Sequence, residues 1–245
     1  IASSTVPEAV RVHLIDYCFS AFDKKVYEGW DWHIDMPQLA SMLLETEGEF
    51  QHLLDRTNKA GRSEFEVEEV ETVTYQALSK IRGEKEAALY LKQHISNPSL
   101  RRKSIEIDLK KKRYDHARSV ALDGVEYDQE KRRGLVQEWH DWLLKIAQAQ
   151  NDREGIMNYA RMLFIDGFRH EQDYYGLMKQ HISPDKWVNW VAELIKDVAT
   201  KSWGYPTGRI AEIYVREGWY DRLLEMVKKS PSLESLERYE KYLKK

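Results

Sequence analysis

Eleven arginine and lysine side chains lie between residues 101 and 133. Clustered cations of this kind could bind the phosphates of a nucleic acid and release their counterions. Seven acidic side chains are interleaved with them, which reduces the net charge of the stretch to +4. A solvated helix face is therefore the alternative interpretation. The candidate nucleic-acid contacts are Arg101, Arg102, Lys103, Lys110, Lys111, Lys112 and Arg113.

Closely spaced aromatic side chains are a second group that could bind a ligand. Trp-x-x-Trp occurs at Trp139 and Trp142, and again at Trp187 and Trp190. Rings at this spacing could line a groove and stack on bases. More often they fill the seam between helices, because each ring buries a large apolar area. The candidate partner contacts are Trp30, Trp32, Trp139, Trp142, Tyr174 and Tyr175.

The segment 30–35 is predicted to be a loop with two tryptophans beside one histidine and two aspartates. Exposed Trp30 and Trp32 would anchor a partner, since tryptophan is over-represented at interface hot spots. Packing of the loop against the helices is one alternative. A metal site formed by His33 with Asp31 and Asp35 is another.

Enzyme signatures are missing: the sequence has no Gly-rich phosphate loop and no Gly-x-Ser-x-Gly. The single cysteine, Cys18, shares an apolar helical stripe with Val10, Leu14, Tyr17 and Ala21, and is interpreted as a buried hydrophobe. The absence of a possible disulfide within the chain favours a reducing, cytoplasmic setting. No apolar run reaches the length of a membrane span. We therefore expect no catalysis, and no metal or cofactor in this chain.

Charge is unevenly distributed along the sequence. Residues 1–75 carry 15 acidic and 6 basic side chains, a net charge of −9. The remaining residues carry 26 acidic and 32 basic side chains, a net charge of +6. This asymmetry predicts two surfaces with different partners, or two ends that attract each other.

Helices must position these side chains, because apolar residues recur with helical spacing and no alternating strand pattern is present. Four aspartates recur at intervals of 37, 33 and 36 residues, and each opens an amphipathic pattern: Asp115, Asp152, Asp185 and Asp221. A period of about 35 residues with two helices per unit is typical of an α-helical repeat array. The sequence thus predicts an all-α fold, a tetratricopeptide-like α-solenoid of antiparallel helix pairs with an N-terminal helical unit.

The predicted N-terminal helical unit spans residues 1–83, and the repeat array spans residues 84–245. Prolines, Pro37 among them, are predicted to mark the starts of helices. A polar helix at 232–243 is predicted to cap the array. The other predicted helices are 7–27, 36–58, 65–82 and 84–95, followed by the pairs 98–113 with 114–124, 133–150 with 152–166, 170–182 with 185–200, and 207–217 with 219–229.

Tyr114-Asp115-x-Ala117, after Lys112-Arg113, resembles the start of the second helix of a tetratricopeptide repeat. Leu223 stands where Ala117 does in the last pair, so the small packing residue is not regular. The resemblance implies a degenerate array. Such arrays usually act as binding surfaces.

Eight short motifs between residues 84 and 230 form a longer pattern: Tyr90-Leu91-Lys92-x-His94, Arg101-x-Lys103, Tyr114-Asp115-x-Ala117, Gly134-Leu135-Val136, Trp139-x-x-Trp142-Leu143, Ala160-x-x-Leu163-Phe164-Ile165, Tyr174-Tyr175-x-Leu177-x-Lys179 and Ile210-Ala211-Glu212-Ile213-Tyr214. Together they resemble the C-terminal helical region of bacterial SWIM zinc-finger proteins. In that family a Cys-x-Cys and Cys-x-His finger would lie upstream. Its zinc ligands match no residue here, so zinc would belong to a missing upstream segment.

We expect a non-catalytic protein-interaction scaffold, the helical part of a longer SWIM zinc-finger-like protein. The alternative function is nucleic-acid binding through the basic 101–133 face, which would assist an upstream zinc finger. A protein partner is expected, and no membrane contact. The oligomeric state is left open.

Overall fold

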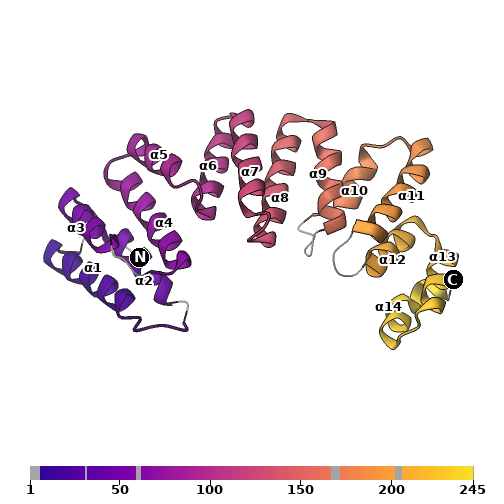
Figure 1. The fold of residues 1–245 in the computed structure, drawn as a ribbon, viewed down its shortest axis with the longest axis horizontal. Coiled ribbons are helices and arrows are strands. Elements are labelled where there is room, and N and C mark those ends of the chain that lie inside the picture. Colours follow the sequence, from indigo (N-terminus) through magenta and orange to yellow (C-terminus); the bar gives the residue numbers. More distant parts are fainter. Residues whose placement is uncertain (1–5, 31, 59–61, 167–171, 202–205, 245) are drawn as a thin grey trace. The chain divides into compact units, whose positions relative to one another are not determined.

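The structure, a computed structural model, consists of α-helices joined by turns (Figure 1). It describes residues 6–30, 32–58, 62–166, 172–201 and 206–244. Within these ranges it contains fourteen helices and no strand, which confirms the all-α prediction.

Two compact units divide the chain, and they are described separately: unit 1 is Ile1–Lys131 and unit 2 is Arg132–Lys245. The predicted boundary follows residue 83 instead. One hydrophobic core contains Leu78, Ala87 and Leu91, so the helices on both sides of residue 83 share buried contacts. The division therefore falls later in the chain than the sequence pattern indicates.

Unit 1 is built around the long helix α4, on which α2, α3, α5 and α6 all pack. Helix α1 packs mainly on α2, and α6 packs mainly on α7. Its core joins Phe19 of α1, Phe50 of α3 and Val73 of α4. The helices described in this unit are α1 (Glu8–Asp23), α2 (Trp32–Leu43), α3 (Glu47–Thr57), α4 (Glu64–Ile81), α5 (Glu84–Gln93), α6 (Pro98–Lys110) and α7 (Tyr114–Asp128).

The single helix predicted over 36–58 is two helices, α2 and α3. The predicted helix is interrupted at Thr46, which forms a capping box at the start of α3. The Thr46 hydroxyl accepts a hydrogen bond from the Glu49 backbone N–H at 3.2 Å, and the Glu49 carboxylate accepts one from the Thr46 backbone N–H at 3.0 Å. Pro37 lies inside α2, not at its start, because α2 already begins at Trp32. The predicted loop at 30–35 is thus helical from Trp32 onward.

Arg11 fixes α1 to the start of α3 through a buried ion pair. Its guanidinium lies 2.9 Å from Glu49 and 3.0 Å from Glu45, and Arg11 is only 7% exposed. Burial opposes ionisation of Glu49, but the backbone N–H groups of Glu45 and Thr46, together with Arg11, outweigh it and lower the pKa of Glu49. The pair holds the N-terminal helix in register with its neighbours.

Unit 2 is a succession of helices in which α8 packs on α9, and α9 packs on both α10 and α11. Helices α11, α12, α13 and α14 then follow, each packed on the next. The described helices are α8 (Arg133–Gln150), α9 (Arg153–Asp166), α10 (Tyr174–Gln180), α11 (Pro184–Lys201), α12 (Pro206–Glu217), α13 (Tyr220–Lys229) and α14 (Leu233–Leu243).

The four periodic aspartates mark helix starts, as predicted. Asp115, Asp185 and Asp221 lie in the first turns of α7, α11 and α13. Asp152 precedes α9 directly, and its carboxylate accepts from the Gly155 backbone N–H at 3.0 Å. A carboxylate at these positions satisfies free N–H groups and interacts favourably with the helix dipole.

The predicted polar cap, α14, is less polar than expected. Tyr239 packs into a small core with Leu223 and Val227 of α13. Leu233 and Leu236, however, are exposed on the outer side of α14. The helix covers α13 but leaves apolar surface of its own.

Candidate protein-interaction surface

Exposed large hydrophobic side chains are concentrated in α1, α2 and the turn between them. Eight of the sixteen such side chains found in the described part of the chain fall between residues 10 and 42. Soluble proteins expose single apolar residues routinely, but concentrated patches mark interaction sites. The eight are Val10, Leu14, Tyr17, Val26, Trp30, Trp32, Leu39 and Met42.

Four aromatic residues meet at the α1–α2 turn, and we call Tyr17, Tyr27, Trp30 and Trp32 the tip cluster. The Tyr17 and Tyr27 hydroxyls lie 2.8 Å apart. The Trp32 ring lies 6.0 Å from Tyr27, edge-on, and 6.1 Å from Trp30. Trp30 is 69% exposed and Trp32 is 59% exposed. The rings therefore contact one another while most of the Trp30 and Trp32 surface remains exposed to solvent.

The turn that carries the tip cluster is tightly bonded. The Val26 N–H donates to the Ala21 carbonyl at 3.0 Å, and the Trp30 N–H donates to the Tyr27 carbonyl at 3.1 Å. Gly29 has φ of +87°, a left-handed conformation that costs glycine little. These bonds fix the path of the chain from the end of α1 to Trp30, and the side chains of Trp30 and Trp32 are exposed.

His33 anchors the base of the turn to α4. Its ring stacks on Phe22 at 4.7 Å, and its Nε2 lies 3.3 Å from the Glu66 carboxylate. Lys25 of the turn lies 3.9 Å from the same carboxylate. The start of α4 consequently lies against the α1–α2 turn.

Glu66 is held in its charged form at this junction. The Ser63 backbone N–H donates to it at 2.8 Å, and this bond is the main reason that the pKa of Glu66 is lowered to about 2. The Ser63 hydroxyl, His33 and Lys25 add to the effect, against the opposing cost of burial. Because its oxygens already serve these donors, Glu66 acts as a structural carboxylate.

The metal site considered for this segment lacks support. Asp31, one of its three suggested ligands, lies outside the described residues. Among the residues that are described, no group of three His, Cys, Asp or Glu side chains could hold a metal ion. His33, one of the suggested ligands, packs on Phe22 and bonds to Glu66 through Nε2, while its Nδ1 is buried without a hydrogen-bond partner in the described part of the chain.

Three of the predicted partner contacts are buried, and this corrects their assignment. Trp139, Tyr174 and Tyr175 are 0%, 1% and 2% exposed. The Tyr174 hydroxyl donates to Asp141 at 2.5 Å. Tyr174 and Tyr175 belong to the core of unit 2, and Trp139 is fully buried, so none of the three presents its ring to a partner in this conformation. Trp142 is half-buried, with the Lys145 ammonium 4.6 Å from its ring centre.

The basic stretch does not form one surface. Arg101 is buried, 3% exposed, with its guanidinium 3.5 Å from Asp128, and so leaves the set of candidate nucleic-acid contacts. Lys103 pairs with Glu106 at 3.6 Å. Arg102 is half-buried and donates to the Ser99 hydroxyl at 3.3 Å. Folding therefore divides the run of cations.

Four consecutive cations remain at the α6–α7 turn. Lys110, Lys111, Lys112 and Arg113 are all exposed. Arg113 lies 2.5 Å from Asp108, whose other oxygen faces His116. The set is a compact cationic turn, much smaller than the predicted 101–133 face.

Sequence reasoning misses a highly connected carboxylate of unit 2, Glu217 at the end of α12. Three donors converge on it: the Tyr175 hydroxyl at 3.0 Å, the Lys179 ammonium at 2.8 Å and the Trp187 indole N–H at 3.0 Å. Burial disfavours its charge, but these donors together lower the pKa of Glu217. Glu217 therefore joins α10, α11 and α12, because its donors come from α10 and α11.

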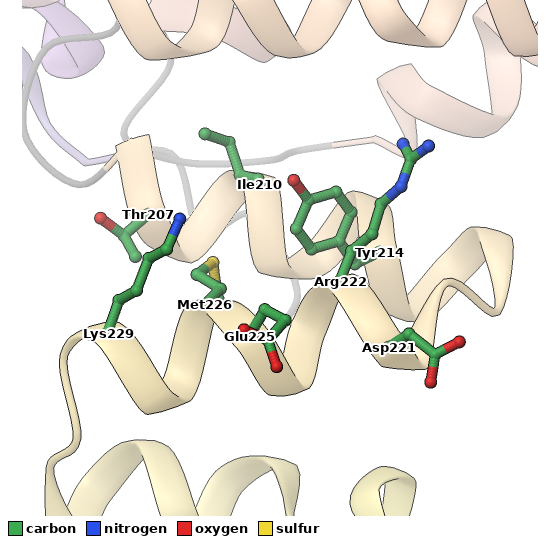
Figure 2. A pocket seen from close by; sticks show the side chains of 8 residues that line it. All are labelled: Thr207, Ile210, Tyr214, Asp221, Arg222, Glu225, Met226 and Lys229. Carbon is green, nitrogen blue, oxygen red and sulfur yellow. The ribbon is translucent and has the colours of Figure 1, made fainter.

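A shallow pocket of about 500 Å³ lies between α12 and α13 (Figure 2). Ile210 and Tyr214 of α12 and Met226 of α13 line the pocket, with Met226 between the two helices, while Lys229 and Arg222 stand at opposite ends. The Arg222 guanidinium also lies 4.4 Å from the Trp219 ring centre. Asp221 and Glu225 balance the two cations, so the pocket selects no sign of ligand charge.

Comparison with protein-family models, curated proteins and solved structures finds no significant match for this chain. Among the described residues, no helix combines the length and apolar character needed to cross a membrane. Function is therefore inferred from the surfaces described above, and chiefly from the tip cluster.

Proposed function

We propose that this chain is a non-catalytic protein-interaction scaffold whose principal contact surface is the tip cluster. The observation that carries the proposal is the exposure of Trp30 and Trp32 on a rigidly bonded turn. Exposed tryptophan costs free energy in water, and it gives a large contact area to a partner that covers it.

Two features of the chain support this function over the nucleic-acid alternative. The cationic turn 110–113 is small, and Arg101 is buried and unable to contribute. Phosphate binding gains its strength from many simultaneous contacts. A nucleic-acid role would need cations beyond these four, so we keep it as the second candidate.

The repeat architecture, the family relationship and the cellular setting of the proposed scaffold are each supported by a different observation. A tetratricopeptide-like array is supported by helix packing of α6 on α7, α8 on α9 and α12 on α13. Membership in a longer SWIM zinc-finger-like protein, with zinc in an upstream segment, is supported by the sequence resemblance alone. A cytoplasmic setting is supported only by the cysteine content, since Cys18 is the single cysteine and no disulfide can form within the chain.

Site-specific photo-crosslinking tests the proposal. A benzophenone amino acid replaces Trp30 in one variant and Val188, which is 57% exposed in unit 2, in the control variant. We expect position 30 to give one discrete adduct in cells of the source organism. Excess wild-type chain should compete for the partner and lower the yield of the adduct, whereas excess Trp32→Ala chain should not. Equal, diffuse labelling from both positions would contradict the proposal.

A further inference from the structure

The tip cluster lies beside the acidic start of α4, and this neighbourhood restricts the partner. Glu66 contacts both Lys25 and His33, which places the first turns of α4 next to the α1–α2 turn. Phe65 and Val67 are exposed on the same stretch, between acidic residues. The aromatic surface and the acidic segment are therefore adjacent parts of one face of unit 1.

Negative charge is crowded at this place. Residues 1–75 carry a net charge of −9. Five glutamates fall within eight positions at the start of α4: Glu64, Glu66, Glu68, Glu69 and Glu71. Two of them face neighbouring side chains of the chain itself, since Glu66 is bonded to Ser63 and His33, and Glu71 is bonded to His94 and Asn97. Burial, and secondarily Glu68, raises the pKa of Glu69. A positively charged partner would relieve this repulsion and be steered toward the surface by the field of the unit.

Exposed aromatic faces favour cations for a separate reason. The face of a tryptophan or tyrosine ring carries negative electrostatic potential, and it attracts guanidinium or ammonium groups. Cation–π contacts of this kind recur within the chain; for example, the Arg62 guanidinium lies 5.2 Å from the centre of the Phe22 ring. Trp30 and Trp32 are 69% and 59% exposed, so much of their aromatic surface is accessible to such groups.

We propose that the tip cluster and the acidic start of α4 together bind a basic, arginine- or lysine-rich segment of a partner protein. The inference rests on the proposed function and adds the chemistry of the partner. Basic side chains would stack on Trp30 and Trp32, and apolar ones would cover the exposed stripes of α1 and α2. Nucleic acids and anionic membrane surfaces carry the same sign of charge as the face and are repelled.

Fluorescence anisotropy of labelled peptides tests the inference with the complete chain. The peptides share one apolar stripe, and their polar positions carry arginine, glutamine or glutamate. We expect the arginine peptide to bind about tenfold more tightly than the glutamine peptide, because opposite charges attract. The glutamate peptide should not bind measurably, and affinity for the arginine peptide should fall as salt rises.

Two double variants assign the binding to this face. The double variant Trp30→Ala, Trp32→Ala should lower the affinity for the arginine peptide by at least about tenfold, an effect of the size typical of hot-spot residues. Leu233→Ala with Leu236→Ala removes exposed apolar side chains from unit 2 and should leave the affinity unchanged. Thermal unfolding followed by circular dichroism confirms that both variants are folded.

Several results would overturn the inference: equal affinity for the arginine and glutamine peptides, no binding of any peptide, or tighter binding of single-stranded DNA to the tip. Salt-sensitive self-association that Lys110→Glu with Lys111→Glu abolishes would also overturn it, since the occupant would then be a second copy. If peptides fail while crosslinking from position 30 persists, only the basic partner is wrong and the interaction surface stands.

Discussion

The tryptophans of unit 1 and unit 2 differ sharply in exposure although the residue type is the same. Trp30 and Trp32 are 69% and 59% exposed, whereas Trp139 and Trp187 are 0% and 5% exposed. All four precede or lie within amphipathic helices. The difference therefore comes from what surrounds each ring, and not from the local pattern.

Polar partners explain much of the difference. In unit 2 the Trp187 indole N–H and the Tyr175 hydroxyl both donate to Glu217, so these rings can be buried without leaving a polar group unsatisfied. At the base of the α1–α2 turn, the Glu66 carboxylate already serves Ser63 and His33. Burying an aromatic ring that carries a polar group requires an acceptor as well as apolar neighbours.

Removal of one tryptophan from each unit should give the largest difference in the free energy of unfolding. Trp139→Ala is expected to lower the free energy of unfolding by about 3–5 kcal/mol, because it leaves a cavity in a packed core. Trp30→Ala should change it by less than about 0.5 kcal/mol, since the ring is mostly solvated. Urea denaturation measures both values, and similar losses would show that the tip cluster is part of the core.

Replacement of the shared acceptor in unit 2 should have the next largest effect. Glu217→Ala leaves the Tyr175 hydroxyl and Trp187 N–H without their acceptor, at an expected cost of about 2–3 kcal/mol. Glu225→Ala is the matched control, because Glu225 is exposed and makes only a surface pair with Lys228 at 3.0 Å. Equal thermal shifts for the two variants would argue against the acceptor explanation.

The smallest effect concerns the pH dependence of unit 1. The pKa of Glu66 is lowered to about 2 in the folded chain, so its contribution is present at neutral pH and is lost as pH falls from about 4.5 toward 2. Glu66→Gln should flatten this part of the acid-unfolding curve, whereas Glu8→Gln on α1 should not. Identical curves for Glu66→Gln and wild type would show that the Ser63 and His33 contacts are not maintained in solution.

Sequence periodicity predicts helices well in this chain but misplaces two features of unit 1. Thr46 and Glu49 form a capping box that interrupts the predicted helix over 36–58. The Thr-x-x-Glu spacing typical of such a box is present in the sequence. On α1 the predicted apolar stripe is only partly buried: Cys18 and Ala21 are buried, but Val10, Leu14 and Tyr17 are exposed. Ile15 and Phe19 are buried instead, in the core that they share with Ala40 of α2 and Phe50 of α3.

The sequence by itself determined the helical class, the aspartates at the starts of α7, α9, α11 and α13, and the candidate tryptophans at positions 30 and 32. These depend on interactions within a few residues, which spacing reveals. Only the tertiary structure decided that Arg101 is buried beside Asp128 and that Glu217 gathers donors from α10 and α11. Such contacts join residues about thirty or more positions apart, and a helix with apolar residues on two faces does not specify which face its distant neighbours will cover.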